Sequence, residues 1–380
     1  MPTPPSNPVA DLLAHHVAAR HTPGALALVE RDGRVLAREV AGHVRPDGAT
    51  AMHAGVRFRI ASLTKPVVTV AALMLVDEGR LALDAPIGEL LPALRDLRLA
   101  GGVAPQRPPT VRDLMRHTSG LAYPFEIADP ALREAWAGAG ITAAMSGLDS
   151  AGFLARIATL PLVAEPGRAF RYGYSTDVLG CIVEAVEGQT LAAVLQRRLF
   201  TPLGMTRTSF ELQAGEDADV ATAFADDTAW HATIPAIGRR TAGQPWIDSG
   251  GGGLISTLDD YAAFGRLLAD GGVVGGTVGG QRLLSEAMMA EMFRNQLPAG
   301  VDGPAAYCGP GYGFGLGLAI RLDWGPAAMP STAGEGAWSG ISGPALFVQP
   351  KERWFAVMMC ANMASRMLCR LALRREAARL

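Results

Sequence analysis

Strand-like runs lie near the two ends of this chain, and helix-like runs fill its middle. Near the N-terminus, two apolar runs flank Asp32-Gly33, a dipeptide that favours a tight β-hairpin turn. Near the C-terminus, apolar or aromatic runs at residues 312–320, 340–348 and 354–360 are separated by turn-forming residues. The pattern predicts one antiparallel sheet whose first and last strands come from opposite ends of the sequence.

Helical periodicity occupies most of the remaining chain. The segments with this pattern are residues 10–20, 65–78, 111–117, 177–187, 191–200, 257–270, 286–293 and 363–379. The predicted fold class is therefore α/β, with an antiparallel sheet built from N- and C-terminal strands, flanking helices and an inserted, mainly helical lobe. We expect residues 1–78 and 245–380 to form the α/β domain and residues 79–244 to form the mainly helical domain.

Composition and charge exclude several classes of function. The 380 residues carry 34 Lys and Arg against 36 Asp and Glu, a formal net charge of −2, so no basic surface for nucleic acid is expected. The longest apolar stretch, residues 67–76, is about half the length of a membrane-spanning helix. The N-terminus shows no secretory signal pattern. If Met1 is the natural start, we expect a cytoplasmic protein with no membrane partner.

Metal and cofactor motifs are not apparent in the sequence. The cysteines, Cys181, Cys308, Cys360 and Cys369, lack Cys-x-x-Cys spacing, so we expect reduced, buried side chains. The glycine-rich runs, among them residues 250–253, lack the Gly-Lys-Ser/Thr of a phosphate-binding loop. They indicate tight turns and close backbone approach instead. We therefore expect no metal and no cofactor.

Ser62 and Lys65 form a Ser-x-x-Lys motif at the start of an apolar helical segment. Residues three apart share a helix face, so the hydroxyl and the amine can meet. A serine becomes nucleophilic when a neighbouring base takes its proton, and burial of a lysine favours the neutral amine that can do so. Ser62 as a simple N-cap is the alternative. Lys65 is one of two lysines in an arginine-using chain, and arginine cannot lose its proton, so we favour catalysis.

Five further segments, residues 58–66, 77–86, 111–121, 172–180 and 202–205, match in order the motifs of one group of enzymes. Through them the sequence resembles the serine β-lactamase-like superfamily and, within it, the class C-like carboxylesterases called family VIII. The resemblance implies the β-lactamase and penicillin-binding-protein fold, with a tyrosine that works beside Ser62 and Lys65. The esterase-type spacing before Asp177-Val-Leu-Gly selects Tyr172, with Tyr174 as the runner-up. Whether the lysine or the tyrosine takes the proton stays open.

The third motif of this superfamily corresponds here to Trp338-Ser339-Gly340. Penicillin-processing members carry a cationic triplet such as Lys-Thr-Gly at this place, where the lysine can hold a substrate carboxylate. Tryptophan offers only an apolar face and one N–H donor. The resemblance implies that Trp338 and Gly340 contact substrate, with a core position for Trp338 as the alternative. It also implies that the backbone N–H groups of Ser62 and Ile341 form the oxyanion hole.

The loss of that lysine predicts that neutral esters are turned over better than carboxylate-bearing substrates. A cation from elsewhere, such as Arg171 or Arg239, would change this expectation. We also expect Tyr123, Phe125 and Trp246 to line the cleft.

The sequence therefore predicts a serine carboxylesterase that hydrolyses small or medium ester substrates through an acyl-enzyme on Ser62. Alternatives on the same scaffold are a β-lactamase or D-amino-acid peptidase, and an acyltransferase or amidase. A catalytically silent binding module would require the loss of Ser62, Lys65 or the tyrosine, and all are present. The Gly-x-Ser-x-Gly elbow of α/β-hydrolases is absent. The expected partner is a small-molecule ester, and the oligomeric state is left open.

Overall fold

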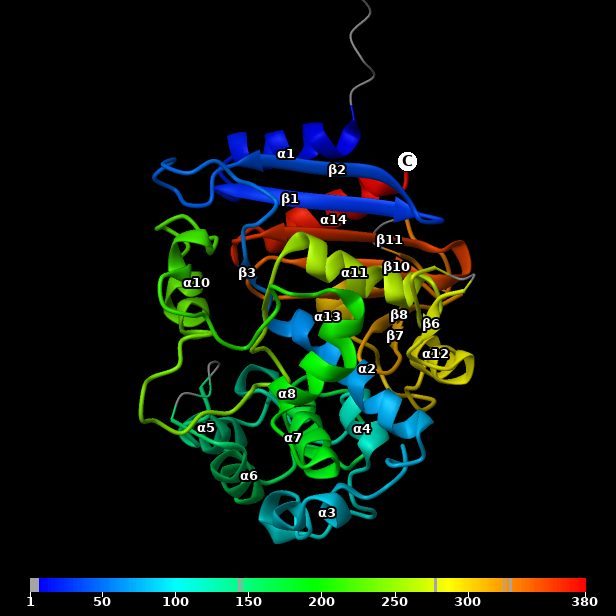
Figure 1. Cartoon of the computed structure of the whole chain (residues 1–380). Coiled ribbons are helices and arrows are strands. Elements are labelled where there is room, and N and C mark those ends of the chain that lie inside the picture. Colours follow the sequence, from blue (N-terminus) through cyan, green and yellow to red (C-terminus); the bar gives the residue numbers. More distant parts are fainter. Residues whose placement is uncertain (1–6, 143–144, 146, 277–278, 324, 328–329) are drawn as a thin grey trace, which may run out of the picture.

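The computed structural model describes residues 7–142, 145, 147–276, 279–323, 325–327 and 330–380. Seven strands form one antiparallel sheet in the order β2-β1-β11-β10-β9-β8-β7 (Figure 1). The strands are β1 (Gly24–Arg31), β2 (Arg34–Gly42), β7 (Tyr312–Phe314), β8 (Ala319–Arg321), β9 (Gly336–Ser339), β10 (Ala345–Gln349) and β11 (Trp354–Cys360). The first strand pairs with the last, so that Ala25 lies opposite Cys360 and Arg31 opposite Trp354. The predicted fold class is confirmed.

The burial of the strands follows their positions in the sheet. All seven residues of β11 are buried, as expected for a central strand covered on both faces. Strand β2 lies at the edge, and most of its residues are exposed or half-buried. The hairpin between β1 and β2 turns at Asp32 and Gly33, whose φ angles of 51° and 73° suit a type I′ turn.

Three helices cover the sheet: one from each end of the chain and one from its interior. Helix α1 (Pro8–Ala18) packs on β1 and β2 and also contacts α14 (Arg366–Ala377), which packs on β11. Helix α11 (Leu258–Ala269) packs on β10 and β11, and it appears in front of these strands in Figure 1.

The other helices are α2 (Thr64–Asp77), α3 (Ile87–Leu90), α4 (Val111–Met115), α5 (Pro130–Gly138), α6 (Ser150–Ala158), α7 (Ser175–Glu187), α8 (Leu191–Leu195), α9 (Thr201–Leu203), α10 (Thr228–Thr233), α12 (Glu286–Phe293) and α13 (Ala305–Cys308). Figure 1 shows α3, α5, α6 and α7 gathered at the end of the molecule away from α1. Two short pairs complete the strands: β3 (Phe58–Arg59) with β4 (Ile255–Ser256), and β5 (Val273–Val274) with β6 (Gln281–Arg282).

Two predicted strands differ from the structure because turns interrupt them. The run 312–320 divides into β7 and β8, since the chain reverses near Gly317, whose φ is 80°. The run 340–348 begins as a turn closed by Gly340 N–H donating to Pro344 O at 2.8 Å, and β10 starts only at Ala345. The segment 191–200 is helical, but α8 ends at Leu195 and a π-helical turn follows.

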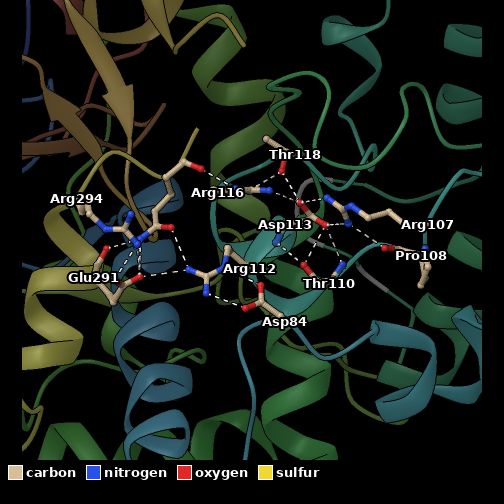
Figure 2. A network of polar contacts seen from close by, with 11 residues as sticks. Asp84, Arg107, Pro108, Thr110, Arg112, Asp113, Arg116, Thr118, Glu291 and Arg294 are labelled. Atoms are coloured by element: carbon tan, nitrogen blue, oxygen red, sulfur yellow. Dashed lines mark hydrogen bonds and ion pairs between the residues drawn. The ribbon is translucent and has the colours of Figure 1, made fainter. Parts of the chain in front are cut away.

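A polar network around α4 links the segments on both sides of it (Figure 2). The buried carboxylate of Asp113 accepts hydrogen bonds from Arg107, Arg116 and Thr118. Burial acts to raise the pKa of Asp113, but the hydrogen bonds from Arg107, Thr118 and Arg116 outweigh it and lower the pKa to about 2. On the other side of α4, Arg112 contacts Glu291 of α12, which fixes α12 against this region.

Among the described residues, no single helix is long and apolar enough to cross a membrane. One bent pair of helices, Ser175–Glu187 with Leu191–Leu203, meets the criteria of length and hydropathy when the two are taken together. All four cysteines are buried free thiols, as predicted.

Candidate active site

Ser62 lies in a helical turn, Ala61–Leu63, that leads directly into α2. Lys65 lies in the first turn of α2 and is buried, with its Nζ 3.4 Å from Ser62 Oγ. The turn is strained, because Ala61 has a φ of 45°, a left-handed value that alanine rarely adopts. The Tyr261 hydroxyl, which donates to Leu63 O at 2.8 Å, holds the turn in place. The predicted meeting of Ser62 and Lys65 is thus present in the structure.

Three tyrosines lie near this pair but contact it differently. Lys65 Nζ donates to the Tyr123 hydroxyl at 3.3 Å and lies 4.7 Å from the centre of the Tyr172 ring. The Tyr174 hydroxyl instead donates to Ile141 O at 3.3 Å, and its ring stacks on Trp136. Burial raises the pKa of Tyr123 well above its usual value, so this phenol keeps its proton at neutral pH.

The structure therefore brings Tyr172, rather than Tyr174, beside Lys65. It also places the Tyr123 hydroxyl on Lys65, a contact that the sequence analysis missed because it expected Tyr123 only as a wall residue. No local spacing signals this contact, since Tyr123 and Lys65 are 58 positions apart.

A loop that contains Gly251 holds Lys65 from the other side. Gly251 O accepts a hydrogen bond from Lys65 Nζ at 2.6 Å. Asp177, at the start of α7, accepts from Gly251 N–H at 2.8 Å and from the Ser249 hydroxyl at 2.7 Å. Burial raises the pKa of Asp177, and the charge of Lys65 opposes this effect. A Cβ on Gly251 would lie 2.3 Å from Asp177 Oδ2, so the glycine run permits the close backbone approach that was predicted.

The turn after β9 packs against the backbone that precedes Ser62. A Cβ on Gly340 would lie 2.2 Å from Ile60 O, and the Ser342 hydroxyl donates to Arg59 O at 2.5 Å. Ile341, at the tip of this turn, is 39% exposed and faces the same cavity as Ser62. Gly340, which was expected to contact substrate, is not among the residues that line this cavity. The turn brings the Ile341 backbone to the Ser62 side of the cavity, where the oxyanion hole is expected.

These residues surround one cavity of about 660 Å³. Of the residues expected at the site, its lining includes Ser62, Tyr123, Phe125, Tyr172, Trp338 and Ile341. Trp338 is buried, and its ring lies 5.3 Å from that of Tyr172 in an edge-on contact. Phe125 is 66% exposed and lies at the rim. The lining is thus largely aromatic and apolar around a small polar centre.

Trp246 is a correction, because the structure does not bring it into this cavity. It lines separate surface depressions, and its Nε1 donates to Asp248 Oδ1 at 3.0 Å. Asp248 also accepts a hydrogen bond from Ala192 N–H, which holds Asp248 beside the start of α8. Among the described residues, no cluster of three or more His, Cys, Asp or Glu side chains is placed to hold a metal ion.

The site thus places a serine hydroxyl next to a buried lysine at the start of an apolar helix, an arrangement in which the amine can activate the hydroxyl. The chain belongs to the Beta-lactamase family, whose model matches residues 9–379. It is 34% identical over 335 residues to protein Rv1367c of Mycobacterium tuberculosis, covering 85% of this chain and 80% of that protein. It is 32% identical over 363 residues to esterase EstB of Burkholderia gladioli, covering 91% of this chain and 87% of EstB.

Among solved structures, EstCE1, "a hydrolase with promiscuous acyltransferase activity", superposes with a TM-score of 0.83 at 26% identity. The match covers 98% of this chain and 97% of EstCE1. The family and its esterase members show that the chain is an enzyme of the serine hydrolase class.

Proposed function

We propose that the protein is a carboxylesterase of the family VIII type that cleaves small or medium-sized esters through an acyl-enzyme on Ser62. The observation that carries the proposal is the 3.4 Å contact between Ser62 Oγ and the buried Lys65 Nζ. Ser62 lies at the wall of a largely apolar cavity. The similarity to esterase EstB along 91% of the chain supports the ester as substrate.

In the proposed first step, Ser62 Oγ attacks the ester carbonyl while the Lys65 and Tyr172 pair takes the hydroxyl proton. The backbone N–H groups of Ser62 and Ile341 stabilise the oxyanion of the tetrahedral intermediate. The bond to the alcohol oxygen then breaks, and the alcohol leaves with that proton. In the second step, water attacks the acyl-enzyme, the acid is released and Ser62 regains its proton.

The side chain at position 338 favours esters over β-lactams within this scheme. Trp338 presents an apolar ring to the cavity where penicillin-processing relatives have a cation. Its indole Nε1 is buried and has no hydrogen-bond partner among the described residues, so it offers no charge-assisted contact.

Acyl transfer to an alcohol is the second candidate, because it uses the same acyl-enzyme and differs only in the acceptor. EstCE1 combines both activities in one protein. Product analysis with added alcohol separates the two, since transfer yields a new ester and hydrolysis yields only the acid.

The test is hydrolysis of p-nitrophenyl esters of increasing acyl length beside a chromogenic cephalosporin. The enzyme should release nitrophenolate efficiently and open the cephalosporin poorly. Ser62→Ala should abolish turnover while the melting temperature stays near that of the parent. Ser209→Ala, which changes a serine that lines a separate surface depression, is the matched control and should keep most of the activity. Efficient cephalosporin turnover, or retained esterase activity in Ser62→Ala, would overturn the proposal.

A further inference from the structure

Two of the four buried cysteines lie against each other near the junction of β11 and α14. Cys360 is the last residue of β11, and Cys369 lies in the first turn of α14. The side-chain Nδ2 of Asn362 donates to Cys360 Sγ at 3.3 Å and lies 3.9 Å from Cys369 Sγ, so one amide nitrogen contacts both sulfurs. The two thiols also form a hydrogen bond with each other. Thiols in contact are the starting point that a disulfide requires.

Two histidines give this pair a polar environment inside the core. His16 of α1 is 3% exposed, and its Nδ1 lies 2.9 Å from Nδ1 of His21, so one ring donates to the other. The hydrogen bond from the Cys360 thiol lowers the pKa of Cys369, burial opposes this effect, and the hydrogen bond and charge of His16 lower the pKa further. The same hydrogen bond between the thiols raises the pKa of Cys360. Cys369 is therefore the thiol that more readily forms the reactive thiolate.

The other two buried cysteines differ from this pair. Burial raises the pKa of Cys181 in α7 above its usual value, and it raises the pKa of Cys308 in α13 to about 12. Both groups stay protonated at neutral pH and act as small apolar side chains. The contrast sets Cys360 and Cys369 apart as the reactive pair.

The sulfur of Cys360 lies directly behind the turn that carries Ile341. A Cβ on Gly343 would lie 3.1 Å from Cys360 Sγ, so the backbone of this turn packs on the sulfur. Asn362, which contacts both sulfurs through its side chain, donates through its backbone N–H to Ser342 O at 2.9 Å. One end of the turn is thus held by a residue that also contacts the thiols.

Cys369 is connected to the other end of the turn through its neighbour on α14. Arg370 follows Cys369 directly, is buried, and donates from Nη2 to Gly340 O at 3.0 Å. A movement of Cys369 therefore moves the residue that holds Gly340. The separation of the two thiols and the position of the Ile341 N–H are linked through these contacts.

We propose that Cys360 and Cys369 form a modification site, which hydrogen peroxide oxidises to a disulfide, and that this disulfide slows the enzyme by displacing the turn at Ile341. The oxidation does not depend on the proposed esterase function, whereas the effect on the rate rests on it. Each of the two cysteines is 1% exposed, so only a small oxidant should reach them. This burial favours hydrogen peroxide over bulkier disulfide reagents.

The oxidation takes place in two balanced steps. The thiolate sulfur of Cys369 attacks one oxygen of the peroxide and the O–O bond breaks; the leaving hydroxide recovers from His16 the proton that Cys369 gave up, and departs as water. Cys369 is then a sulfenic acid, whose sulfur has given two electrons to the peroxide. The sulfur of Cys360 next attacks the sulfenic sulfur, the S–O bond breaks, and the hydroxide leaves with the Cys360 proton as a second water. One peroxide and two thiols thus yield one disulfide and two waters.

The disulfide changes the contacts that hold the turn. It brings the two sulfurs to a separation of about 2 Å, so the ends of β11 and α14 shift relative to each other. Asn362 loses its thiol acceptors, and Arg370 moves with Cys369. A displaced Ile341 N–H stabilises the oxyanion less well, and a misplacement of about 1 Å can cost up to about 100-fold in rate. The turn is also held against the backbone that precedes Ser62, so we expect a smaller loss in kcat, about tenfold, with KM nearly unchanged.

The experiment treats the fully reduced enzyme with hydrogen peroxide, removes the peroxide and follows two readouts. Intact-mass measurement should show the loss of two hydrogen atoms per chain, and peptide mapping without reductant should recover the peptides of Cys360 and Cys369 joined. The kcat for p-nitrophenyl butyrate should fall about tenfold. Dithiothreitol should restore both the mass and the rate. Because dithiothreitol does not reduce methionine sulfoxide, this reversal separates the disulfide from oxidation of the methionines.

Two serine variants and a control assign the chemistry. Cys369→Ser removes the attacking thiol and should keep its rate after peroxide. Cys360→Ser removes the second thiol and should gain one oxygen atom on Cys369 without forming a disulfide. The matched control is Cys181→Ser, which replaces another buried cysteine and should lose activity as the parent does. The ratio of treated to untreated rates cancels differences in basal activity, and the mass and reversal of the parent decide the matter if a variant does not fold.

The inference is overturned if peroxide leaves both thiols of the parent free or joins other cysteines. It is also overturned if the disulfide forms while kcat stays unchanged, or if Cys369→Ser loses activity reversibly as the parent does. These outcomes leave the esterase proposal intact as long as the untreated enzyme hydrolyses esters. If no ester is hydrolysed at all, it is the proposed function that fails, and peptide mapping still decides whether the disulfide forms.

Discussion

Removal of single hydroxyl groups should separate the three tyrosines around Lys65. Tyr172 contacts the lysine through its ring, Tyr123 accepts a hydrogen bond from it, and the Tyr174 hydroxyl is bonded to Ile141 O instead. Phe substitution keeps each ring and therefore the packing, so changes in rate report on the hydroxyl.

The expected loss for Tyr172→Phe follows from the proton-transfer role proposed for its hydroxyl, and the other two follow from the hydrogen bonds of Tyr123 and Tyr174. General acid–base catalysis contributes about 100-fold or more, so Tyr172→Phe should lower kcat/KM by at least that factor. A hydrogen bond to a charged group contributes about 1.5 to 3 kcal/mol, or roughly 10- to 150-fold. The Lys65–Tyr123 contact, at 3.3 Å, is long, so Tyr123→Phe should lie near the lower end of that range. Tyr174→Phe should change the rate by less than about threefold.

The assay is kcat/KM for p-nitrophenyl butyrate, measured with the melting temperature of each variant. A larger loss for Tyr174→Phe than for Tyr172→Phe would show that the tyrosine motif has been placed in the wrong register. A near-normal rate for Tyr172→Phe together with a loss above about 100-fold for Tyr123→Phe would move the proton-transfer role to Tyr123.

Three further changes test the surroundings of the site. Gly340→Ala should reduce activity and the melting temperature, because its Cβ would lie 2.2 Å from Ile60 O. In the control Gly252→Ala, the atom nearest to the added Cβ is 3.9 Å away. Thermal melts and esterase rates check both variants. Asp177→Asn should lower kcat about tenfold by weakening the charge-assisted contacts that hold the loop behind Lys65, and steady-state kinetics should show a nearly unchanged KM. The pKa of Asp113 is lowered from 3.8 to about 2 in the folded protein. This shift adds about 2 kcal/mol to the free energy of unfolding above about pH 4, and the contribution is lost as the pH falls towards 2. Urea unfolding of Asp113→Asn should therefore show a deficit near neutral pH that shrinks in acid, and a deficit independent of pH would contradict this.

The features predictable from the sequence are those set by local patterns. The hairpin at Asp32-Gly33 and the helix at 286–293 appear as expected, because turn chemistry and apolar periodicity act over a few residues. The contact between Ser62 and Lys65 follows in the same way from their spacing within one helical turn. The boundaries at 78/79 and 244/245 between the two predicted domains stay a prediction.

The features that were missed depend on contacts between distant segments. Tyr123 reaches Lys65 across 58 positions, and Arg370 reaches the cavity from α14, so neither contact leaves a spacing signal. The aromatic character of Trp246 indicated a cleft residue, but the hydrogen bond to Asp248 directs it elsewhere. Composition names the residue types at a site, and the tertiary fold decides which of them meet.

The central claim is that Ser62 is the residue that becomes acylated, and covalent labelling tests it most directly. The enzyme would be incubated with a p-nitrophenyl alkylphosphonate, which phosphonylates activated serines and releases one nitrophenolate. Intact-mass measurement should show one adduct per chain, and peptide mapping should place it on Ser62. Ser62→Ala should remain unlabelled under the same conditions. An adduct on another residue, or undiminished labelling of Ser62→Ala, would contradict the account.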